Sequence, residues 1–361
     1  MADLIRGVFG TKSDRRPPTV TMEDVAQRAG VSRALVSIVF RGVAGASPAT
    51  RERVMRAAGE LAYRPDQRAR LLGRSRTQVV GVTFGLHDEF HAEVVEQLYQ
   101  AVDGTGYELA LGATAPSRDE HRAVQSLLDY RCEALILVGP ALPGEAIEEL
   151  AERLPVVVVA RALRSRAVQV VRTDDVAGLG LAVEHLAGLG HQAIAHVDGQ
   201  RAPGAGERRR GYRAAMRRLG LAAHTRVIPG GLTERAGERA AAQLLAGPPP
   251  TAVAAFNDHC AAGLLAAARE RGIRVPDQLS VVGYDNSHIA GLATVALTTI
   301  AQDTPALAGQ ALDLALARTE HEHGPAAEIV LPPRLVIRQT SARPADSEQV
   351  AGDRRGGDHV E

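Results

Sequence analysis

Two short helical patterns joined by a tight turn, in the segment VTMEDVAQRAGVSRALVSIVF at residues 20–40, constrain the fold more than any other part of the chain. In the first pattern apolar residues recur at i, i+3, i+4 and i+7, which indicates a helix with one buried face. These residues are Met22, Val25, Ala26 and Ala29. Gly30 stands where helices commonly end in a left-handed residue, and Ser32 has the chemistry of an N-cap for a second helix. The segment therefore predicts either a helix-turn-helix or an ordinary helical hairpin with a solvated face.

The second helix of this segment has one apolar side, formed by Val36, Val39 and Phe40. Its opposite side faces outward, and in a helix-turn-helix that side meets base edges and phosphates in the major groove of DNA. The outward-facing residues are Arg33, Ala34, Ser37, Ile38 and Arg41. The pattern thus makes these residues candidates for contact with double-stranded DNA.

A third helix and a strong local charge extend this prediction. Ser47 can cap the third helix, and Pro48 suits its first position. Between residues 15 and 76 the chain has thirteen arginines and five acidic residues, a net charge of +8. The whole chain has 42 basic and 42 acidic residues, so the remainder carries −8. A neutral protein with one basic end is polarised toward a polyanion such as nucleic acid.

Residues 65–73 form a short basic segment after these helices. Asp66 could cap a helix here, and Ala69, Leu71 and Leu72 are its apolar residues. A segment this short falls below the roughly 12–15 residues that even a marginal isolated helix needs, so a helix here requires a partner. An apolar residue on such a helix can act as a wedge between base steps in the minor groove. A plain charged linker is the alternative.

The sequence up to this point resembles the lactose-repressor/galactose-repressor family of bacterial transcription regulators. The runs that carry the resemblance are VTMEDVAQRAGVS, VAGASPATRERV and LAYRPDQRARLLG, without gaps from residue 20 to residue 73. Further on, LGHQAIAHVDG at 189–199, FND at 256–258 and the run from VPDQLSVVGYD to LTTIAQD at 275–303 match the family's effector domain. The resemblance covers about residues 19–340 and implies a homodimer whose two heads read a pseudo-palindromic operator.

The resemblance also implies further contacts with DNA, carried over by position. Thr21 and Met22 contact backbone or base at the start of the first helix. Paired hinge helices open the minor groove, with Leu72 as the wedge and Ala69 as an apolar neighbour on the same helix. Matching backbone-contact positions are Ser47, Thr50 and Tyr63.

Two positions of the second helix depart from the pattern frequent in the family. Ile38 stands where many members have Arg, and Arg41 stands where they have Asn. Ile38 cannot make the bidentate bond that distinguishes guanine by about 1–3 kcal/mol, and it can only pack on an apolar group such as a thymine methyl. The operator sequence should therefore not be copied from other members.

Residues 79–341 read as alternating strands and helices. Apolar runs predict strands at 79–84, 108–113, 134–139, 156–160, 193–198, 252–257 and 280–285. Amphipathic runs predict helices at 92–102, 120–130, 176–189, 208–219, 235–245 and 261–271. This alternation indicates an α/β fold with parallel sheets covered on both faces. The length exceeds one such sheet, so we expect two doubly wound lobes, as the resemblance to periplasmic-binding-protein-like effector domains also implies, with the chain crossing near residues 173 and 302.

Polar side chains follow three of these strands, and doubly wound sheets bind ligands beyond the carboxyl ends of their strands. Asn257 and Asp285 each end a strand, and Arg208 begins a helix after a strand. A carboxylate accepts, a guanidinium donates through a fixed fork, and an amide does both, so together they suit neighbouring hydroxyls. Residues of these types at such positions are more often turn or surface residues, but the resemblance implies that they match the family's effector-contacting Arg, Asn and Asp.

Three more residues are assigned to the effector site. Phe90 and Gln302 are candidates for its lining, and Arg161 at the cleft mouth would suit a carboxylate or phosphate, although it could also be a solvated loop arginine. The chain has no Trp, and Leu232 stands where some members place a Trp shelf, which weakens a simple pyranose assignment. We therefore expect a sugar or sugar-like metabolite as effector, with an anionic one left open.

Sequence features of other functions are weak. Cys132 and Cys260 have no CxxC spacing, and two cysteines without a signal peptide indicate a reducing cytoplasm. Histidine pairs at 87/91 and 321/323 have metal-like spacing but no supporting cluster of Cys or carboxylates, so we expect surface histidines. We expect no catalytic residue, no metal, no cofactor and no membrane-spanning segment.

The expected organisation has five parts: a disordered tail at 1–18, a DNA-binding head at 19–64, a hinge and linker at 65–78, an effector-binding and dimerisation domain at 79–341, and a disordered tail at 342–361. The last tail lacks the apolar heptads of tetrameric members, so we expect a homodimer. The expected function is a repressor that its effector releases from the operator. Corepressor-dependent repression or activation, and solute capture, are the alternatives.

Overall fold

The computed structural model describes residues 20–41, 44–63, 76–320 and 326–345. The chain divides into two compact units, residues 1–77 and residues 78–361, which we call the head and the two-lobed unit. Ala69 and Leu72, which the sequence assigns to DNA binding, lie outside the described residues. The side chain of Arg41 also lies outside the described part.

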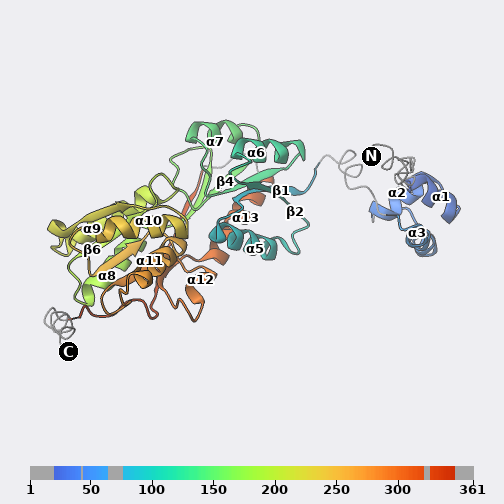
Figure 1. Ribbon diagram of the computed structural model, residues 1–361. Coiled ribbons are helices and arrows are strands. Elements are labelled where there is room, and N and C mark those ends of the chain that lie inside the picture. Colours follow the sequence, from blue (N-terminus) through green and yellow to red (C-terminus); the bar gives the residue numbers. More distant parts are fainter. Residues whose placement is uncertain (1–19, 42–43, 64–75, 321–325, 346–361) are drawn as a thin grey trace, which may run out of the picture. The chain divides into compact units, whose positions relative to one another are not determined.

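Three helices form the described part of the head: α1 (Met22–Ala29), α2 (Arg33–Arg41) and α3 (Pro48–Glu60) (Figure 1). Thr21 caps α1 in a capping box with Asp24, and Gly30 ends it in the left-handed region with φ 64°. The hydroxyl of Ser47 caps α3 by accepting from the Thr50 N–H at 3.2 Å. The apolar stripes of the three helices meet in one small core, as the sequence predicts.

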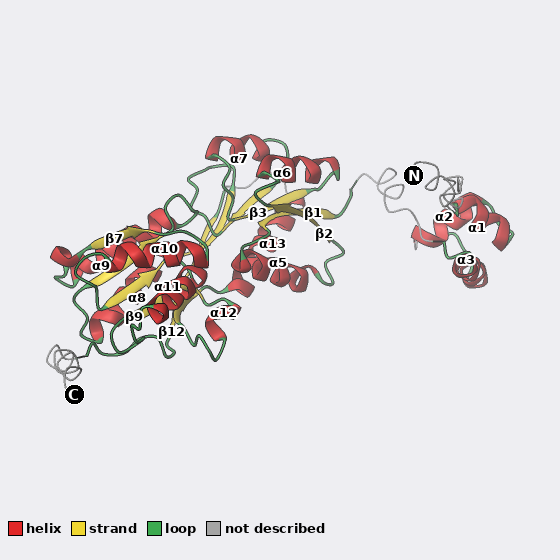
Figure 2. Cartoon of the chain, viewed as in Figure 1, coloured by secondary structure: helices red, strands yellow, loops and turns green. Residues whose placement is uncertain are grey.

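The first lobe of the two-lobed unit is a six-stranded parallel sheet. Its strands, in spatial order, are β11 (Glu328–Leu331), β5 (Gln169–Thr173), β4 (Val156–Val159), β3 (Ala134–Val138), β1 (Val79–Gly85) and β2 (Glu108–Thr114). Helices α5 (Glu89–Val102) and α13 (Thr304–Glu320) cover one face. Helices α6 (Glu120–Asp129) and α7 (Gly144–Ala151) cover the other, as Figure 2 shows.

The second lobe repeats this plan. Its strands, in spatial order, are β12 (Arg334–Val336), β10 (Thr298–Ala301), β9 (Ser280–Asp285), β8 (Ala252–Ala255), β6 (Ile194–Asp198) and β7 (Arg226–Pro229). All neighbours pair in parallel except β10 and β12. Helices α8 (Asp175–Gly188) and α9 (Ala205–Arg218) cover one face, and α10 (Glu234–Leu245) and α11 (Asp258–Glu270) cover the other. The short helices η1 (Ala222–His224) and α12 (His288–Gly291) lie in loops.

The chain passes between the lobes three times within the described residues. It passes after β5 at residue 174, after β10 at 302–303, and between β11 and β12 at 332–333. The sequence analysis did not predict the third passage, because β11 and β12 are only four and three residues long. The predicted α/β class with two doubly wound parallel sheets is confirmed.

Candidate functional site

A cavity of about 490 Å³ lies between the two lobes. From the first lobe, Gly85 and Thr114 end β1 and β2, and Gly139 and Ala160 directly follow β3 and β4. The second lobe contributes residues at the ends of β6 to β9 and the start of α9. These are Pro203, Arg208, Leu232, Thr233, Phe256, Asn257 and Asp285. The cavity thus occupies the place where parallel sheets bind ligands.

Arg208 lies at the base of this cavity and is buried. Its Nε donates to Asp175 Oδ1 at 2.8 Å, one terminal nitrogen donates to the Phe256 carbonyl at 2.7 Å, and the other lies 3.5 Å from Asp285 Oδ1. The guanidinium also stacks 3.6 Å from the centroid of the buried Tyr284 ring. Burial works against its charge, but Asp175 and Asp285 raise the pKa of Arg208 overall.

Asp285 ends β9 with a strained backbone. Its φ is 102°, a conformation that non-glycine residues rarely adopt and that often marks functional sites. Gln302 Nε2 donates to Asp285 Oδ1 at 2.8 Å, so Gln302 supports the carboxylate and does not itself line the cavity. Burial raises the pKa of Asp285, and the positive charge of Arg208 acts in the opposite direction.

Asn257 joins the cavity wall to α11. Its Oδ1 caps the helix by accepting from the Cys260 N–H at 2.9 Å, and its Nδ2 donates to the Leu232 carbonyl at 3.0 Å. Phe90, from α5 of the opposite lobe, also lines the cavity. The structure therefore brings Arg208, Asn257, Asp285 and Phe90 to one cavity.

His91 is a cavity residue that the sequence analysis missed. Its Nδ1 accepts from the Gly85 N–H at 3.0 Å, so in the neutral ring the proton lies on Nε2. Burial lowers the pKa of His91, although the charge of Asp88 opposes that change. Gly139 makes room for the ring, because an added Cβ there would collide with it. His91 was expected at the surface, because sequence spacing does not show that its ring meets the Gly85 N–H six residues before it and packs against Gly139 after β3.

Arg161 does not line the cavity. Its guanidinium donates to the carbonyls of Pro140 at 2.9 Å and Leu142 at 2.5 Å, which fixes the loop after β3. The residue before it, Ala160, lines the cavity instead. The prediction that Arg161 faces the ligand is therefore wrong, and its side chain instead holds the loop after β3.

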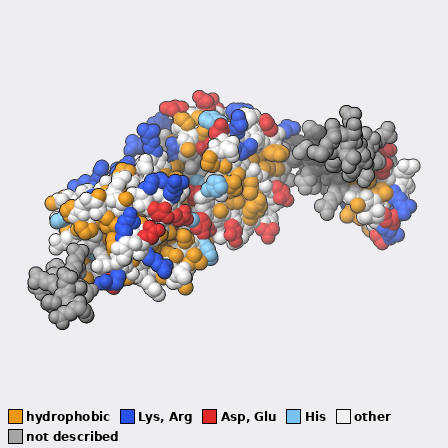
Figure 3. All heavy atoms as spheres, in the orientation of Figure 1, with side chains coloured by type: hydrophobic (Ala, Val, Ile, Leu, Met, Phe, Trp, Pro, Cys, Tyr) orange, Lys and Arg blue, Asp and Glu red, His pale blue; other side chains and the backbone are white. Residues whose placement is uncertain are grey.

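On the face drawn in Figure 3, acidic, basic and histidine side chains lie close together where the two lobes meet. Among the described residues that line the cavity, Arg208 is the single Lys or Arg, whereas Asp88 and Asp285 are carboxylates. Because Arg208 is already paired with Asp175 and Asp285, the cavity offers no unpaired guanidinium to a negatively charged ligand.

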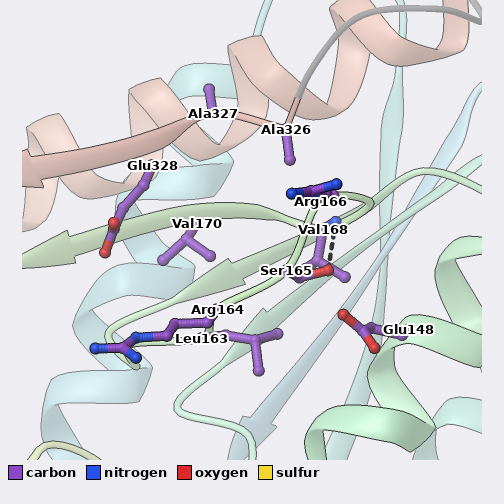
Figure 4. A pocket seen from close by; sticks show the side chains of 10 residues that line it. All are labelled: Glu148, Leu163, Arg164, Ser165, Arg166, Val168, Val170, Ala326, Ala327 and Glu328. Atoms are coloured by element: carbon purple, nitrogen blue, oxygen red, sulfur yellow. Dashed lines mark hydrogen bonds between the residues drawn. The ribbon is translucent and has the colours of Figure 1, made fainter.

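A second cavity, of about 580 Å³, lies in the first lobe where β5 and β11 begin (Figure 4). The exposed side chains of Arg164 and Arg166 stand beside it, with Glu148 and Glu328. Parallel sheets bind ligands where strands end, so this position does not match the rule. We therefore take the cavity between the lobes as the candidate effector site.

The head presents most of the side chains expected at DNA. Thr21, Arg33, Ala34 and Ser47 are exposed. Ser37, Ile38 and Thr50 are half-buried. Met22 and Tyr63 pack against the head core, and the Tyr63 ring lies 5.6 Å from that of Phe40.

Other chemistries find little support in the described residues. Burial raises the pKa of the Cys132 thiol to about 11 and that of Cys260 to about 12, so neither is a thiolate at neutral pH. No group of three or more His, Cys, Asp or Glu side chains that could hold a metal ion occurs in the described ranges. None of the described helices is long and apolar enough to cross a membrane.

Two known sequence families match the chain. The model described as "Bacterial regulatory proteins, lacI family" matches residues 21–66, which include the helices of the head. The model described as "Periplasmic binding protein-like domain" matches residues 183–341, which include all strands of the second lobe. The two matches thus cover the candidate DNA-contacting helices and the part of the cavity wall that the second lobe contributes.

Several transcriptional regulators are similar to this chain along almost their whole length. The HTH-type transcriptional regulator GalR of Escherichia coli K12 is 33% identical over 331 residues, which cover 90% of this chain and 96% of GalR. The lac repressor dimer bound to operator and the anti-inducer ONPF matches with a TM-score of 0.76 at 29% identity, over 90% of this chain and 99% of that chain. The transcriptional regulator CelR in complex with cellobiose matches with a TM-score of 0.66 at 28% identity, over 90% and 100%.

Proposed function

This chain belongs to the lacI family of bacterial regulatory proteins and is a DNA-binding transcriptional regulator, and we propose that an uncharged sugar in the cleft releases it from its operator. It acts as a homodimer on a pseudo-palindromic site. The similar lac repressor is likewise a dimer bound to its operator. As a regulator of transcription, it acts in the cytoplasm, where its operator lies. The proposal rests chiefly on one observation: the lobes enclose a largely apolar cavity with a few charged and polar side chains at the carboxyl ends of both sheets.

The cavity has the groups that hydroxyls require. Asp285 and Asp88 accept hydrogen bonds, and His91 can donate from Nε2. Phe90 and Phe256 add apolar surface. A sugar presents both hydroxyls and C–H faces, so this mixture suits it, and the relative CelR binds cellobiose.

The charge of the cavity favours a neutral ligand. A phosphate or carboxylate would meet Asp88 and Asp285 without an unpaired cation to offset the repulsion. The earlier option of an anionic effector rested on Arg161, whose guanidinium is bonded to loop carbonyls. We therefore assign an uncharged sugar.

On the DNA side, α2 reads the major groove. On this helix Arg33 and Ala34 are exposed, whereas Ser37 and Ile38 are half-buried. Arg41 is the last residue of the same helix. Thr21, Met22, Ser47, Thr50 and Tyr63 contact the backbone or bases around this helix, and Leu72 with Ala69 enters the minor groove. A ligand changes operator affinity only through its different affinity for the lobe arrangements that bind and that release DNA.

Thermal unfolding with a panel of sugars tests the effector class. Galactose, ribose and cellobiose are compared with galactose 6-phosphate, ribose 5-phosphate and galacturonate. A ligand at 100 times its Kd stabilises the native state by about 2.7 kcal/mol, which raises the Tm measurably. We expect a Tm increase from at least one neutral sugar and none from the charged ones.

Asn257→Asp is the variant that tests the cavity itself. The new carboxylate can still cap α11, but the substitution removes the amide donor and adds a negative charge at the cavity. Asn257→Asp should abolish the sugar-induced increase in Tm. Asn286→Asp makes the same chemical change outside the cavity lining and should keep the increase. Charged sugars that raise the Tm as much as neutral ones, or a cleft variant that responds like the wild type, would contradict the proposal.

A further inference from the structure

A histidine joins the two lobes beside the cavity. His259, the second residue of α11, has Nδ1 2.5 Å from Glu234 Oε1 and Nε2 2.9 Å from Glu89 Oε2. Glu234 begins α10 in the same lobe, whereas Glu89 begins α5 in the other lobe. Glu89 Oε1 also accepts from the His288 backbone N–H of α12 at 3.1 Å. One imidazole thus lies between carboxylates that belong to opposite sides of the cleft.

Only the protonated ring can make both contacts well. A neutral imidazole has one N–H donor and one acceptor, and a carboxylate only accepts. In the neutral state one of the two glutamates would therefore face a nitrogen lone pair. The imidazolium donates from both nitrogens, and each bond is then charge-assisted.

The charged groups that act on His259 are acidic: the two bonded glutamates and the buried Asp258, which precedes it on α11. Partial burial alone would lower the pKa of His259, but the bonds to Glu234 and Glu89 and their charges raise it overall. The pKa of Glu234 is lowered, because its bond to His259 outweighs its own burial. The raised pKa of His259 and the lowered pKa of Glu234 both favour a protonated imidazole beside an ionised carboxylate.

The three side chains are coupled to the cavity by the chain itself. Asp88, Thr233 and Asn257 are the N-caps of α5, α10 and α11, and each lines the cavity. Glu89 and Glu234 directly follow two of these caps, and His259 lies two residues after the third. Separation of the lobes at the cavity would therefore break the His259–Glu89 contact.

We propose that His259 is a protonation-dependent clasp between the lobes, which makes closure of the cleft stronger at acidic pH. Because the pKa of His259 is raised on folding, its stabilising effect is complete below the ordinary imidazole value and is lost as the pH rises through the raised value. The regulatory meaning of the clasp rests on the proposed function, since it acts on the cleft assigned to the effector. The clasp itself can be measured without effector or DNA.

The first test is a histidine NMR titration of the full chain, with His259→Gln to assign the signal. We expect His259 to titrate above about 6.5, and Glu89→Gln to lower its pKa by about half a unit or more. Glu96→Gln is the control, because it removes the same charge from an exposed position farther along α5 and should leave the pKa nearly unchanged. Equal effects of Glu89→Gln and Glu96→Gln would overturn the clasp, since His259 would then not touch the first lobe in solution.

The second test is a double-mutant cycle on the Tm, with Glu89→Gln, His259→Gln and the double variant. At pH 6 the sum of the Tm losses in the two single variants should exceed the Tm loss in the double variant, because both single substitutions remove the same contact. At pH 9 they should become additive. Additivity at both pH values would overturn the proposal, and a failure to find any sugar ligand would leave this cycle unaffected, so the two failures are distinguishable.

Discussion

Arg208 holds the base of the cavity together through bonds to three groups from different elements. Asp175 begins α8, the Phe256 carbonyl follows β8, and Asp285 ends β9. The sequence analysis identified the residue as a ligand contact from its place after a strand. The structure adds that its guanidinium pairs with two carboxylates that are largely removed from solvent, so its loss affects folding as well as binding.

Arg208→Met should therefore destabilise the two-lobed unit by about 3–5 kcal/mol, because it leaves Asp175 and Asp285 without their buried partner. Chemical denaturation of the purified variant measures this loss. Arg210→Met, two residues along α9, removes an exposed pair with Glu207 and should cost less than about 1 kcal/mol. Equal losses in both variants would show that the buried cluster contributes no more than a surface ion pair.

At the scale of elements, α10 and α11 pack with their backbones in close contact. A Cβ added at Gly263 of α11 would collide with the Glu234 carbonyl of α10, and one at Gly237 would collide with the Cys260 carbonyl. These glycines bring together the N-termini that carry Thr233 and Asn257 to the cavity. The crossing of the two helices thus sets the shape of one cavity wall.

Gly263→Ala should force α10 and α11 apart and cost about 1–3 kcal/mol or more, as overpacking does. Gly206→Ala in α9 meets nothing within 4 Å and should instead stabilise the helix by about 0.5–1 kcal/mol. Thermal unfolding of the two variants, side by side, gives the comparison. A neutral Gly263→Ala would mean that the helices can separate without loss.

Most strands could be predicted because they are long apolar runs. The other strands were not predicted, because polar residues interrupt them or because they are short. β4 is four consecutive valines that are all buried, the pattern of a central parallel strand. β5 contains Gln169 and Arg172, which break that pattern. α13 has no clear polar face because it packs its alanines and leucines against the first sheet, so its periodicity gave no signal.

The candidate site was partly predictable for a similar reason. Asn257 and Asp285 follow recognisable strands, so the rule on strand ends placed them. The roles of His91 and Arg161 depend on the backbone atoms they meet, Gly85 N–H for one and the Pro140 carbonyl for the other. Sequence spacing carries no information on contacts between loops of this kind.

At the scale of the whole molecule, a basic head, with three helices among its described residues, and a two-lobed unit with a cavity between its lobes divide the function between them. The described part of the head has a small core of seven buried residues. A single head of this size offers few base contacts, so joining two half-sites in a dimer supplies the affinity that one head lacks. A ligand-released repressor must therefore show both sequence-specific DNA binding and its loss when the cleft is filled.

The most direct test is to select sheared genomic DNA of the source organism with the purified full chain at moderate salt and to sequence the retained fragments. We predict a few enriched fragments that share a near-palindrome, their loss on addition of a neutral sugar that raises the Tm, and no enrichment by Arg33→Ala. Weak, salt-sensitive retention of random fragments, unchanged by any sugar and equal in the variant, would contradict the account.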